Sequence, residues 1–331
     1  MRIVIPTAGY GTRLRPHTWS KPKPLVTVAG KPVLGHVLDM FADLPVVDEI
    51  VFIVGYLGEQ IEAYVEEAYP QYRTRYVEQK ELIGQSHAIW LAREGLTGPM
   101  IMAFVDTLIE VDLSTIPDEE ADAIAWVKEV PDPRRFGVAE VGPDGWVLQL
   151  IEKPQDMSNN LAVVGFYYFK KAQDLIQAIE EQMERQTQLK GEYFLADAIN
   201  IMLESGMKMN VRSVEVWNDC GKPDAMLETN SYLLDHGRDN SEKSAERLDV
   251  VIIPPVYIDP SAKVEQSVIG PHVSIGSGCV IQRSLIRDSI IDTDSHISDA
   301  SLTQSLIGRE ARVVGQQRSL NIGDSSEISH V

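Results

Sequence analysis

The chain has 331 residues, 44% of them hydrophobic, which is enough to bury one large core and a second folded unit. Its formal charge of −19 argues against a general nucleic-acid binder, because such proteins usually present a basic face. The two cysteines exclude a disulfide framework, the N-terminus opens on a strand rather than an export leader, and no apolar run approaches the roughly 18–20 residues of a membrane span. We therefore expect a cytoplasmic globular protein with neither a nucleic-acid nor a membrane partner.

Short β-rich runs and amphipathic helical stretches alternate along residues 1–235. In chain order, the predicted strands are Arg2–Ile5, Glu49–Val54, Thr74–Glu78, Met100–Phe104, Ala123–Lys128, Val147–Ile151 and Ala162–Phe169, and the predicted helices are Val33–Leu44, Leu57–Tyr69, Gln85–Glu94, Ala172–Arg185 and Leu195–Glu204. Repeated alternation of strand and helix is typical of crossover units. The prediction is an α/β fold with a Rossmann-like, mostly parallel sheet, whose active site lies beyond the carboxyl ends of its strands.

A different period begins after a charged, serine-rich linker, His236–Arg247. From Ile258 to Val313 an aliphatic residue recurs every five or six positions, often followed by glycine or a small polar residue. Such self-similarity is typical of a stacked solenoid in which each short strand covers its neighbours. We predict a parallel β-helix of hexapeptide repeats, and hence two domains, 1–240 and 250–331. A β-helix can bury apolar surface against a second subunit, so we expect a homo-oligomer.

The first 38 residues hold six basic side chains and no acidic one. Within them a glycine-bearing turn, Gly9–Gly11, follows the first predicted strand, and Arg13 comes two residues later. Backbone N–H groups exposed by such a turn, with fixed positive charge beside them, form a cradle for a polyphosphate. Two familiar phosphate motifs are excluded: Leu14 stands where a dinucleotide fingerprint needs its third glycine, and no Gly-Lys-Ser/Thr sequence ends the loop.

The string Gly-Tyr-Gly-Thr-Arg-Leu-Arg-Pro that ends at Pro16, with Lys-Pro-Lys-Pro-Leu ending at Leu25, closely resembles the sugar-phosphate nucleotidylyltransferases, or NDP-sugar pyrophosphorylases. Further blocks similar to that family follow in order over residues 1–235: Gln79 with Gly84, Val105-Asp106, Phe136-Gly137-Val138, Glu152-Lys153-Pro154, Gly191-Glu192 and Trp217-Asn-Asp219-Cys-Gly221. A hexapeptide tail also occurs in several branches of the family, including long-form glucose-1-phosphate thymidylyltransferases. This resemblance implies that the β-helix is left-handed.

The resemblance also implies the reaction: a sugar 1-phosphate, most simply glucose 1-phosphate, attacks the α-phosphorus of dTTP or UTP, and pyrophosphate leaves. By the same resemblance, the catalytic residues are Arg13, Lys23 and Lys153; the nucleotide-binding residues are Ala8, Gly9, Gly11, Thr12, Gln79 and Gly84; the sugar-phosphate-binding residues are Gly137, Glu152, Lys153 and Gly165; and the ligands of a Mg²⁺ cofactor are Asp106 and Asp219. The attacking group is already an anion at neutral pH. Positioning and charge stabilisation therefore dominate, and no general base is needed.

Several alternatives stay open at this point. The sequence does not distinguish dTTP from UTP or name the sugar, and a mannose-1-phosphate guanylyltransferase or an N-acetylglucosamine-1-phosphate uridylyltransferase would fit the same motifs. A non-catalytic regulatory paralogue is favoured only by Val105-Asp106-Thr107, where the family usually has Gly-Asp-Asn. An acyltransferase in the β-helix is a further alternative, against which the short tail without an acceptor-binding insertion argues. The symmetry of the oligomer and any regulatory role of the β-helix are also open.

Overall fold

The computed structural model describes residues 1–116, 120–244 and 249–315. Two units can be distinguished within the chain. The first comprises residues 1–27 and 31–229, and the second comprises Val28–Gly30 together with the chain from Asn230 onward. Within the described residues, no helix combines the length and the apolar character that crossing a membrane requires.

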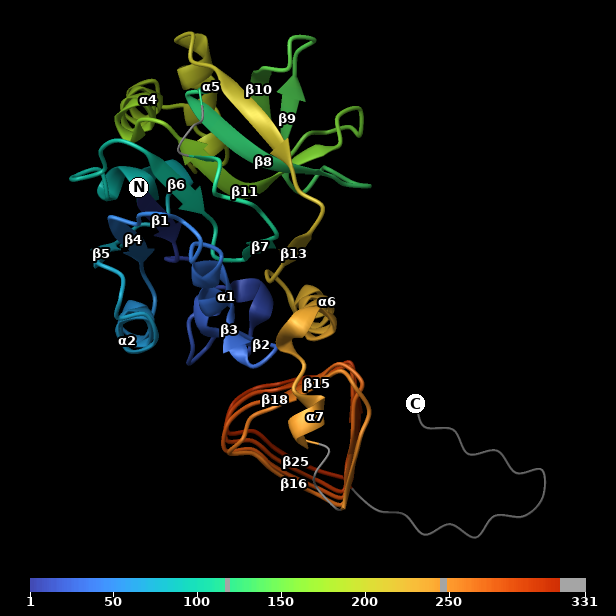
Figure 1. Cartoon of the computed structure of the whole chain (residues 1–331). Coiled ribbons are helices and arrows are strands. Elements are labelled where there is room, and N and C mark those ends of the chain that lie inside the picture. The colour runs from blue at the N-terminus through green and yellow to red at the C-terminus, as the bar shows by residue number, and fades with distance from the viewer. Residues whose placement is uncertain (117–119, 245–248, 316–331) are drawn as a thin grey trace. The chain divides into compact units, whose positions relative to one another are not determined.

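A nine-stranded sheet forms the centre of the first unit (Figure 1). Its strand β1 (Arg2–Pro6) lies between β4 (Glu49–Val54) and β6 (Met100–Ala103), both parallel to it, and β5 (Thr74–Glu78) runs parallel to β4. A helical crossover connects each of these strands to the next, as parallel neighbours require. The predicted Rossmann-like α/β arrangement is confirmed.

The other half of the sheet is antiparallel around β11. Its remaining strands are β8 (Ala123–Glu129), β9 (Gly137–Val141), β10 (Val147–Glu152), β11 (Leu161–Phe169) and β12 (Met209–Ser213). β11 runs antiparallel to β6, β8 and β9, and β9 forms a hairpin with β10. The connections from β8 to β11 are loops and turns without a crossover helix, and such connections join antiparallel strands. The sheet is therefore mixed: β4, β1, β5 and β6 are parallel, β11 is antiparallel to its neighbours, and β12 adds a parallel strand beside β8 at the other edge.

The helices and short strands complete the connections. The described helices are α1 (Val33–Asp39), α2 (Gly58–Ala68), α3 (Gln85–Leu91), α4 (Ala172–Glu184), α5 (Leu195–Glu204), α6 (Pro223–Leu233) and α7 (Ser241–Ser244), with 3₁₀ turns at Thr12–Leu14 and Lys23–Leu25. Two small ribbons pair β2 (Thr27–Val28) with β3 (Lys31–Pro32), and β7 (Thr107–Ile109) with β13 (Trp217–Asp219). Helix α6 and strands β7, β9, β12 and β13 were not among the predicted elements.

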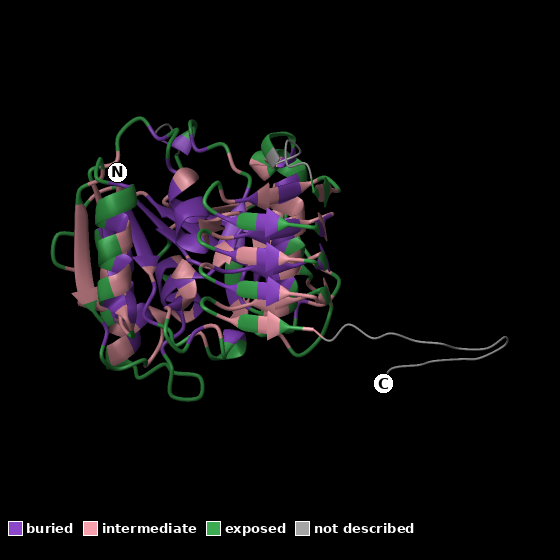
Figure 2. Cartoon of the chain, turned by 90° about the horizontal axis from the view of Figure 1, so that it is seen from below, coloured by how far each residue is buried: buried purple, intermediate pink, exposed green. Residues whose placement is uncertain are grey.

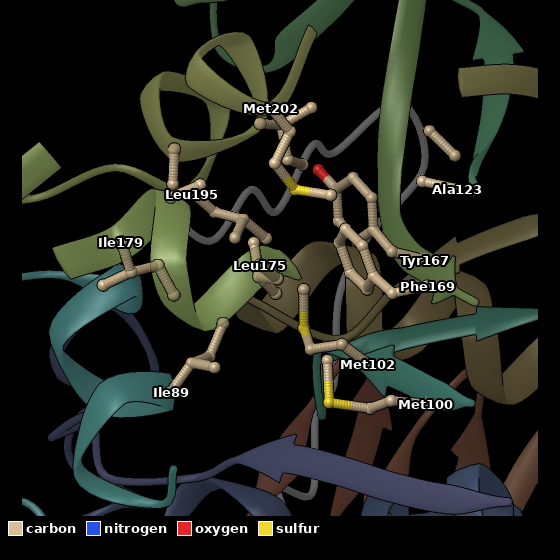
Figure 3. Packing of buried hydrophobic residues seen from close by; sticks show 14 of the residues in the cluster. Ile89, Met100, Met102, Ala123, Tyr167, Phe169, Leu175, Ile179, Leu195 and Met202 are labelled. Atoms are coloured by element: carbon tan, nitrogen blue, oxygen red, sulfur yellow. The ribbon is translucent and has the colours of Figure 1, made fainter. Parts of the chain in front are cut away.

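The core of the first unit covers both faces of the sheet. On one face, Met100 and Met102 of β6 and Tyr167 of β11 pack with residues of α3, α4 and α5 (Figure 3). On the other face, the ring of Phe166 lies 4.9 Å from Trp126 and 6.0 Å from Phe41, measured between ring centroids. Neighbouring strand residues alternate between the faces, which is why nearly continuous apolar runs mark these strands in the sequence.

The second unit is a parallel β-helix built from three four-stranded sheets. Its strands are β14 (Val250–Ile252), β15 (Val256–Ile258), β16 (Lys263–Glu265), β17 (Ser267–Ile269), β18 (Val273–Ile275), β19 (Val280–Gln282), β20 (Leu285–Arg287), β21 (Ile290–Ile291), β22 (His296–Ser298), β23 (Ser301–Thr303), β24 (Leu306–Ile307) and β25 (Arg312–Val314). Each pairs with the strand one coil later, as when Val250 aligns with Ser267. The predicted solenoid is confirmed.

The recurring aliphatic residues of this region stack inside the β-helix. Ile258, Ile275, Ile291 and Ile307 occupy equivalent positions in successive coils. Strands of the other two sheets, such as β16 and β20, carry one buried residue between two exposed ones, and Figure 2 shows such an alternation along the stacked strands. The five- or six-residue period in the sequence therefore corresponds to one side of a coil, and three periods make one complete coil.

Part of the predicted linker has regular structure. Leu234–Arg238 forms a turn that is kinked at His236 and Gly237, where the backbone angles are not helical, and Ser241–Ser244 forms α7. The carboxylate of Asp239 accepts hydrogen bonds from the backbone N–H groups of Ser241 and Val256, each at 2.9 Å, which fixes the segment against strand β15. Residues 245–248 of the predicted linker, and residues 316–331 of the predicted second domain, lie outside the described residues.

Candidate functional site

A cleft of about 380 Å³ opens at the carboxyl ends of the parallel strands of the first unit. We call it the first cleft. It is lined by Pro6, Thr7, Ala8, Gly9, Lys23, Pro24, Gln79, Leu82, Gly84, Gln85, Ala88, Phe104, Val105, Asp106 and Glu192. Ligands of open α/β sheets bind at this edge, because the loops that follow the strands converge there. The predicted nucleotide-binding residues Ala8, Gly9, Gln79 and Gly84 are thus brought together.

The glycine turn is held tightly against the segment that carries Lys23. Gly11 has φ 61, and a Cβ at this position would lie only 2.8 Å from Cβ of Lys23. The hydroxyl of Thr18 donates a hydrogen bond to the Gly11 carbonyl at 2.9 Å, and the buried Leu14 anchors the following 3₁₀ turn. A glycine is required here for both its backbone conformation and the space it leaves. Gly11 and Thr12 themselves shape the turn without lining the first cleft.

Gln79 and Gly84 form a preorganised wall of the first cleft. Gln79 is 6% exposed, and its side-chain amide donates to the Gly84 carbonyl at 3.3 Å. Gly84 has φ 116, and a Cβ on it would lie 2.3 Å from the carbonyl oxygen of Tyr193. The Gln79 amide can donate and accept at once, which suits the edge of a pyrimidine base.

A second cleft of about 190 Å³ adjoins the first and shares Gln85, Phe104 and Asp106 with it. Its other lining residues are Arg13, Thr107, Arg135, Phe136, Gly137, Leu150, Glu152, Val163, Val164, Gly165, Tyr167, Leu195, Ala196, Trp217 and Asp219. It lies where β11 changes partners from β9 to β6 and where Gly165, with φ 79, breaks the register. A Cβ on Gly165 would lie 2.4 Å from the ring of Phe104.

Two carboxylates meet at the junction of the clefts. Asp106 directly precedes β7 and Asp219 ends β13, and the antiparallel pairing of these strands aligns Asp219 with Thr107. Burial, and next the negative charge of Asp106, raise the pKa of Asp219 above its ordinary value. Burial alone would also raise the pKa of Asp106, but the hydrogen-bonded ammonium of Lys23, a backbone N–H and the charge of Arg13 together outweigh burial and lower that pKa. The guanidinium of Arg13 lies 4.0 Å from the same Asp106 oxygen.

Asp106 and Asp219 fit a divalent cation. They are neighbouring oxygen donors whose mutual repulsion a cation would relieve, and hard divalent cations prefer such ligands. Among the described residues, no group of three or more His, Cys, Asp or Glu side chains is arranged to hold a metal ion. The protein thus offers two carboxylates, a number typical of sites where substrate phosphates and water complete the coordination of Mg²⁺.

Glu152 and Lys153 lie at the rim of the second cleft. Burial raises the pKa of Glu152, and the ammonium of Lys153, 3.4 Å from its carboxylate, only partly opposes this. Lys153 itself is half exposed, and its ammonium lies 4.7 Å from the centroid of the Phe194 ring. Lys153 does not belong to the lining of either cleft, in contrast to the other residues predicted to bind the sugar phosphate.

The basic N-terminal stretch serves the site only in part. Arg13 and Lys23 reach the clefts, with Arg13 lining the second cleft and Lys23 the first. Lys31 instead pairs with Asp39 at 2.6 Å, and Arg15 stacks on an exposed indole ring. Tertiary structure thus separates the cations that face the clefts from those that stabilise surrounding loops.

Sequence reasoning did not identify several residues of the second cleft. Arg135, Gln85, Tyr167 and Trp217 all line it. Trp217 belongs to a block that carried the family resemblance, and Arg135 directly precedes another such block, but neither was given a role in the site. Gln85 follows Gly84 directly and Tyr167 lies two residues after Gly165, so proximity to predicted site residues was an available signal for both.

The fold and the two adjoining clefts agree with the family that the sequence matches. Residues 3–236 match the nucleotidyl transferase family, and residues 252–326 match the GMPPB C-terminal domain. The chain is similar to a UDP-glucose pyrophosphorylase structure complexed with UDP-glucose, with a TM-score of 0.61 and 22% identity over 71% of this chain and 98% of that one. This likeness concerns the fold.

Two sequence relatives match this chain almost end to end. The glucose-1-phosphate thymidylyltransferase of Streptomyces griseus is 30% identical over 98% of both chains. The low-salt glycan biosynthesis nucleotidyltransferase Agl11 of Haloferax volcanii is 30% identical over 99% of both. The chain belongs to the nucleotidyl transferase family and is an enzyme of the sugar nucleotidyltransferase class, whose members act on a nucleoside triphosphate and a sugar 1-phosphate and generally use a divalent metal.

Proposed function

We propose that this protein joins a sugar 1-phosphate, most simply glucose 1-phosphate, to dTTP or UTP and releases pyrophosphate. The observation that carries the proposal is the pair of adjoining clefts that share Asp106, with Lys23 at their junction. The first cleft is the nucleotide site and the second is the sugar-phosphate site. Two anionic substrates then meet beside a carboxylate pair and a cluster of cations.

The residues act by holding charge rather than by moving protons. Lys23 neutralises charge that develops at the α-phosphate, and Arg13 binds the departing β- and γ-phosphates with a planar fork that matches phosphate oxygens. Glu152 and the backbone at Gly137 bind sugar hydroxyls. Lys153 turns from its contact with Phe194 toward the sugar phosphate when that ligand binds. The incoming phosphate oxygen is already ionised, so no general base is required.

Asp106 and Asp219 are proposed to hold Mg²⁺. When bound, this ion supplies positive charge to the phosphate oxygens and reduces the repulsion between the two substrates. The ammonium of Lys23 contacts one oxygen of Asp106, and a cation held by Asp106 and Asp219 would share the compensation of that carboxylate and leave N–H donors of Lys23 for phosphate oxygens.

The relatives favour a pyrimidine nucleotide. One is named a glucose-1-phosphate thymidylyltransferase, and another, from Haloferax volcanii, a UTP–glucose-1-phosphate uridylyltransferase that is 32% identical over 68% of this chain and 93% of its own length. The proposed base contacts of Gln79 and Gly84 suit either base. Leu82, 37% exposed on the wall of the first cleft, is the apolar neighbour that would meet a thymine methyl group.

The test is a panel of four nucleoside triphosphates against the 1-phosphates of glucose, galactose, mannose and N-acetylglucosamine, scored by pyrophosphate release with Mg²⁺. The proposal expects the highest kcat/KM for dTTP or UTP with glucose 1-phosphate. Preference for GTP with mannose 1-phosphate would refute the nucleotide and sugar assignment. Absence of pyrophosphate from every pair would refute the activity.

We also propose that residues 1–240 carry catalysis while the β-helix, residues 250–331, assembles the chain into a homo-oligomer in the cytoplasm. The β-helix exposes Val251 and Leu285, 57% and 45% accessible, on strands β14 and β20 of one sheet. Light scattering of the full chain tests the assembly, and a monomer at micromolar concentration would refute it.

A further inference from the structure

We infer that Arg135, in addition to Lys153, binds the phosphate group of the sugar 1-phosphate. This inference deepens the proposed function and rests on it. Arg135 lines the second cleft, although neither its sequence context nor the family resemblance assigned it a role.

The charge balance of the second cleft calls for another cation. Three carboxylates line it, Asp106, Asp219 and Glu152, whereas its cationic lining residues are Arg13 and Arg135. Arg13 lies near Asp106, toward the nucleotide side. Lys23 and the proposed cation compensate Asp106 and Asp219, but Glu152 still lines the cleft, and a dianionic phosphate that enters beside it needs a positive partner of its own because like charges at close range in a partly enclosed site repel strongly.

The guanidinium of Arg135 is available for this role. Within the part of the chain that the structure describes, it donates no hydrogen bond and forms no ion pair, and its charge is the smallest of the influences on the pKa of Asp132. Its neighbour Arg134 differs, because it holds Asp132 in a two-pronged ion pair with distances of 2.9 and 2.8 Å. Two adjacent arginines are thus in different states: one is neutralised by its own loop, and the other faces the cleft.

The backbone around Arg135 is fixed in place. The ring of Phe136 packs edge-on against Trp217 with 4.9 Å between the ring centroids. This contact holds the loop against β13, the strand that also carries Asp219. The Phe136 carbonyl accepts a hydrogen bond from the Lys153 N–H at 2.9 Å. The segments that carry Arg135 and Lys153 therefore lie side by side through this backbone contact, and we infer that both side chains contact the same phosphate.

Arginine suits the phosphate better than lysine does here. Its planar fork can donate two parallel hydrogen bonds to two phosphate oxygens, which fixes the orientation of the group that attacks. Orientation of the attacking oxygen matters because the reaction depends on in-line positioning. Lys153, flexible and half exposed, supplies charge without that geometry.

The test compares Arg135→Gln, Arg135→Lys and Arg134→Gln in steady-state assays of the full chain, with KM measured separately for each substrate. Arg135→Gln should raise KM for the sugar 1-phosphate about 10- to 100-fold, the loss expected for hydrogen bonds to a charged group, with the nucleotide KM unchanged. Arg135→Lys should recover part of that loss. Arg134→Gln should leave both KM values near those of the wild type.

Each other outcome decides against the inference. An unchanged sugar-phosphate KM in Arg135→Gln, or an equal rise in Arg134→Gln, would overturn it, and a rise confined to the nucleotide KM would place Arg135 at the other substrate. The thermal midpoint of each variant shows whether a change reflects folding. Failure of the proposed function is distinguishable, because the wild-type enzyme would then form no pyrophosphate with any substrate pair.

Discussion

Replacing Lys23 by alanine should have two separable effects, because its ammonium both faces the nucleotide cleft and neutralises Asp106. The side chains of Lys23 and Asp106 are only 16% and 26% exposed, so the pair is partly desolvated. Loss of one preorganised charge from the transition state costs about 3–4 kcal/mol, which corresponds to a 10²- to 10³-fold fall in kcat. KM should change much less, since the charge stabilised by Lys23 develops mainly in the transition state.

The same substitution should also lower the free energy of unfolding. It leaves the Asp106 carboxylate half-buried without its main partner, which costs about 1–3 kcal/mol. In an Asp106→Asn background the cost should be smaller, because no charge is left uncompensated. Lys31→Ala is a matched control: it breaks the ion pair with Asp39 outside the clefts, so it should affect stability while leaving kcat unchanged.

The loss of stability in Lys23→Ala should depend on pH. In the wild type Lys23 lowers the pKa of Asp106, so the stability from this pair is present above the ordinary carboxyl value and is lost as the pH falls through the lowered pKa. The deficit of Lys23→Ala should therefore be largest near neutral pH and shrink in acid. Urea unfolding from pH 3 to pH 7 and pyrophosphate release provide the measurements. A folded variant with a kcat within threefold of wild type, or with an equal stability loss in both backgrounds, would refute the reasoning.

Three further predictions concern other parts of the site. Gly84→Ala would place a Cβ 2.3 Å from the Tyr193 carbonyl oxygen and should lower the unfolding free energy by more than about 2 kcal/mol in urea titrations. The control is Gly98→Ala, at φ 70 with open space around it, which should cost only about 1 kcal/mol, and equal losses in the two variants would contradict the clash. Because burial raises the pKa of Glu152, the free energy of unfolding of the wild type should fall as the pH rises from about 4.5 through that pKa. Glu152→Gln should remove this decrease of stability with pH, and an unchanged decrease would assign the effect to another group. EDTA should abolish pyrophosphate release, and Mg²⁺ should restore it. The circular dichroism spectrum should stay constant, because two carboxylates at a surface cleft do not hold the fold together, and unfolding by EDTA would indicate a structural metal instead.

Local patterns in the sequence were sufficient for much of the architecture. Burial on both faces produces the apolar runs of strands such as β4 and β6, and their predicted positions agree with the structure within a residue. The coils of the β-helix could be predicted from their period, since each side of a coil contributes one inward aliphatic residue. Strands β7 and β13, three residues each, were missed because so short a run carries no period.

What sequence determined in the site was the chemistry available to it: a glycine turn with cations after β1, and carboxylates at strand ends. Only the tertiary structure decided which of these groups meet. Asp106 and Asp219 are separated by more than a hundred residues and become neighbours through the pairing of β7 with β13. Arg135 faces the cleft while Arg134 is neutralised by Asp132, and Lys153 points to Phe194. The physical reason is that the sequence states the type of each side chain position by position. Charge compensation and burial instead depend on long-range contacts that no short segment specifies.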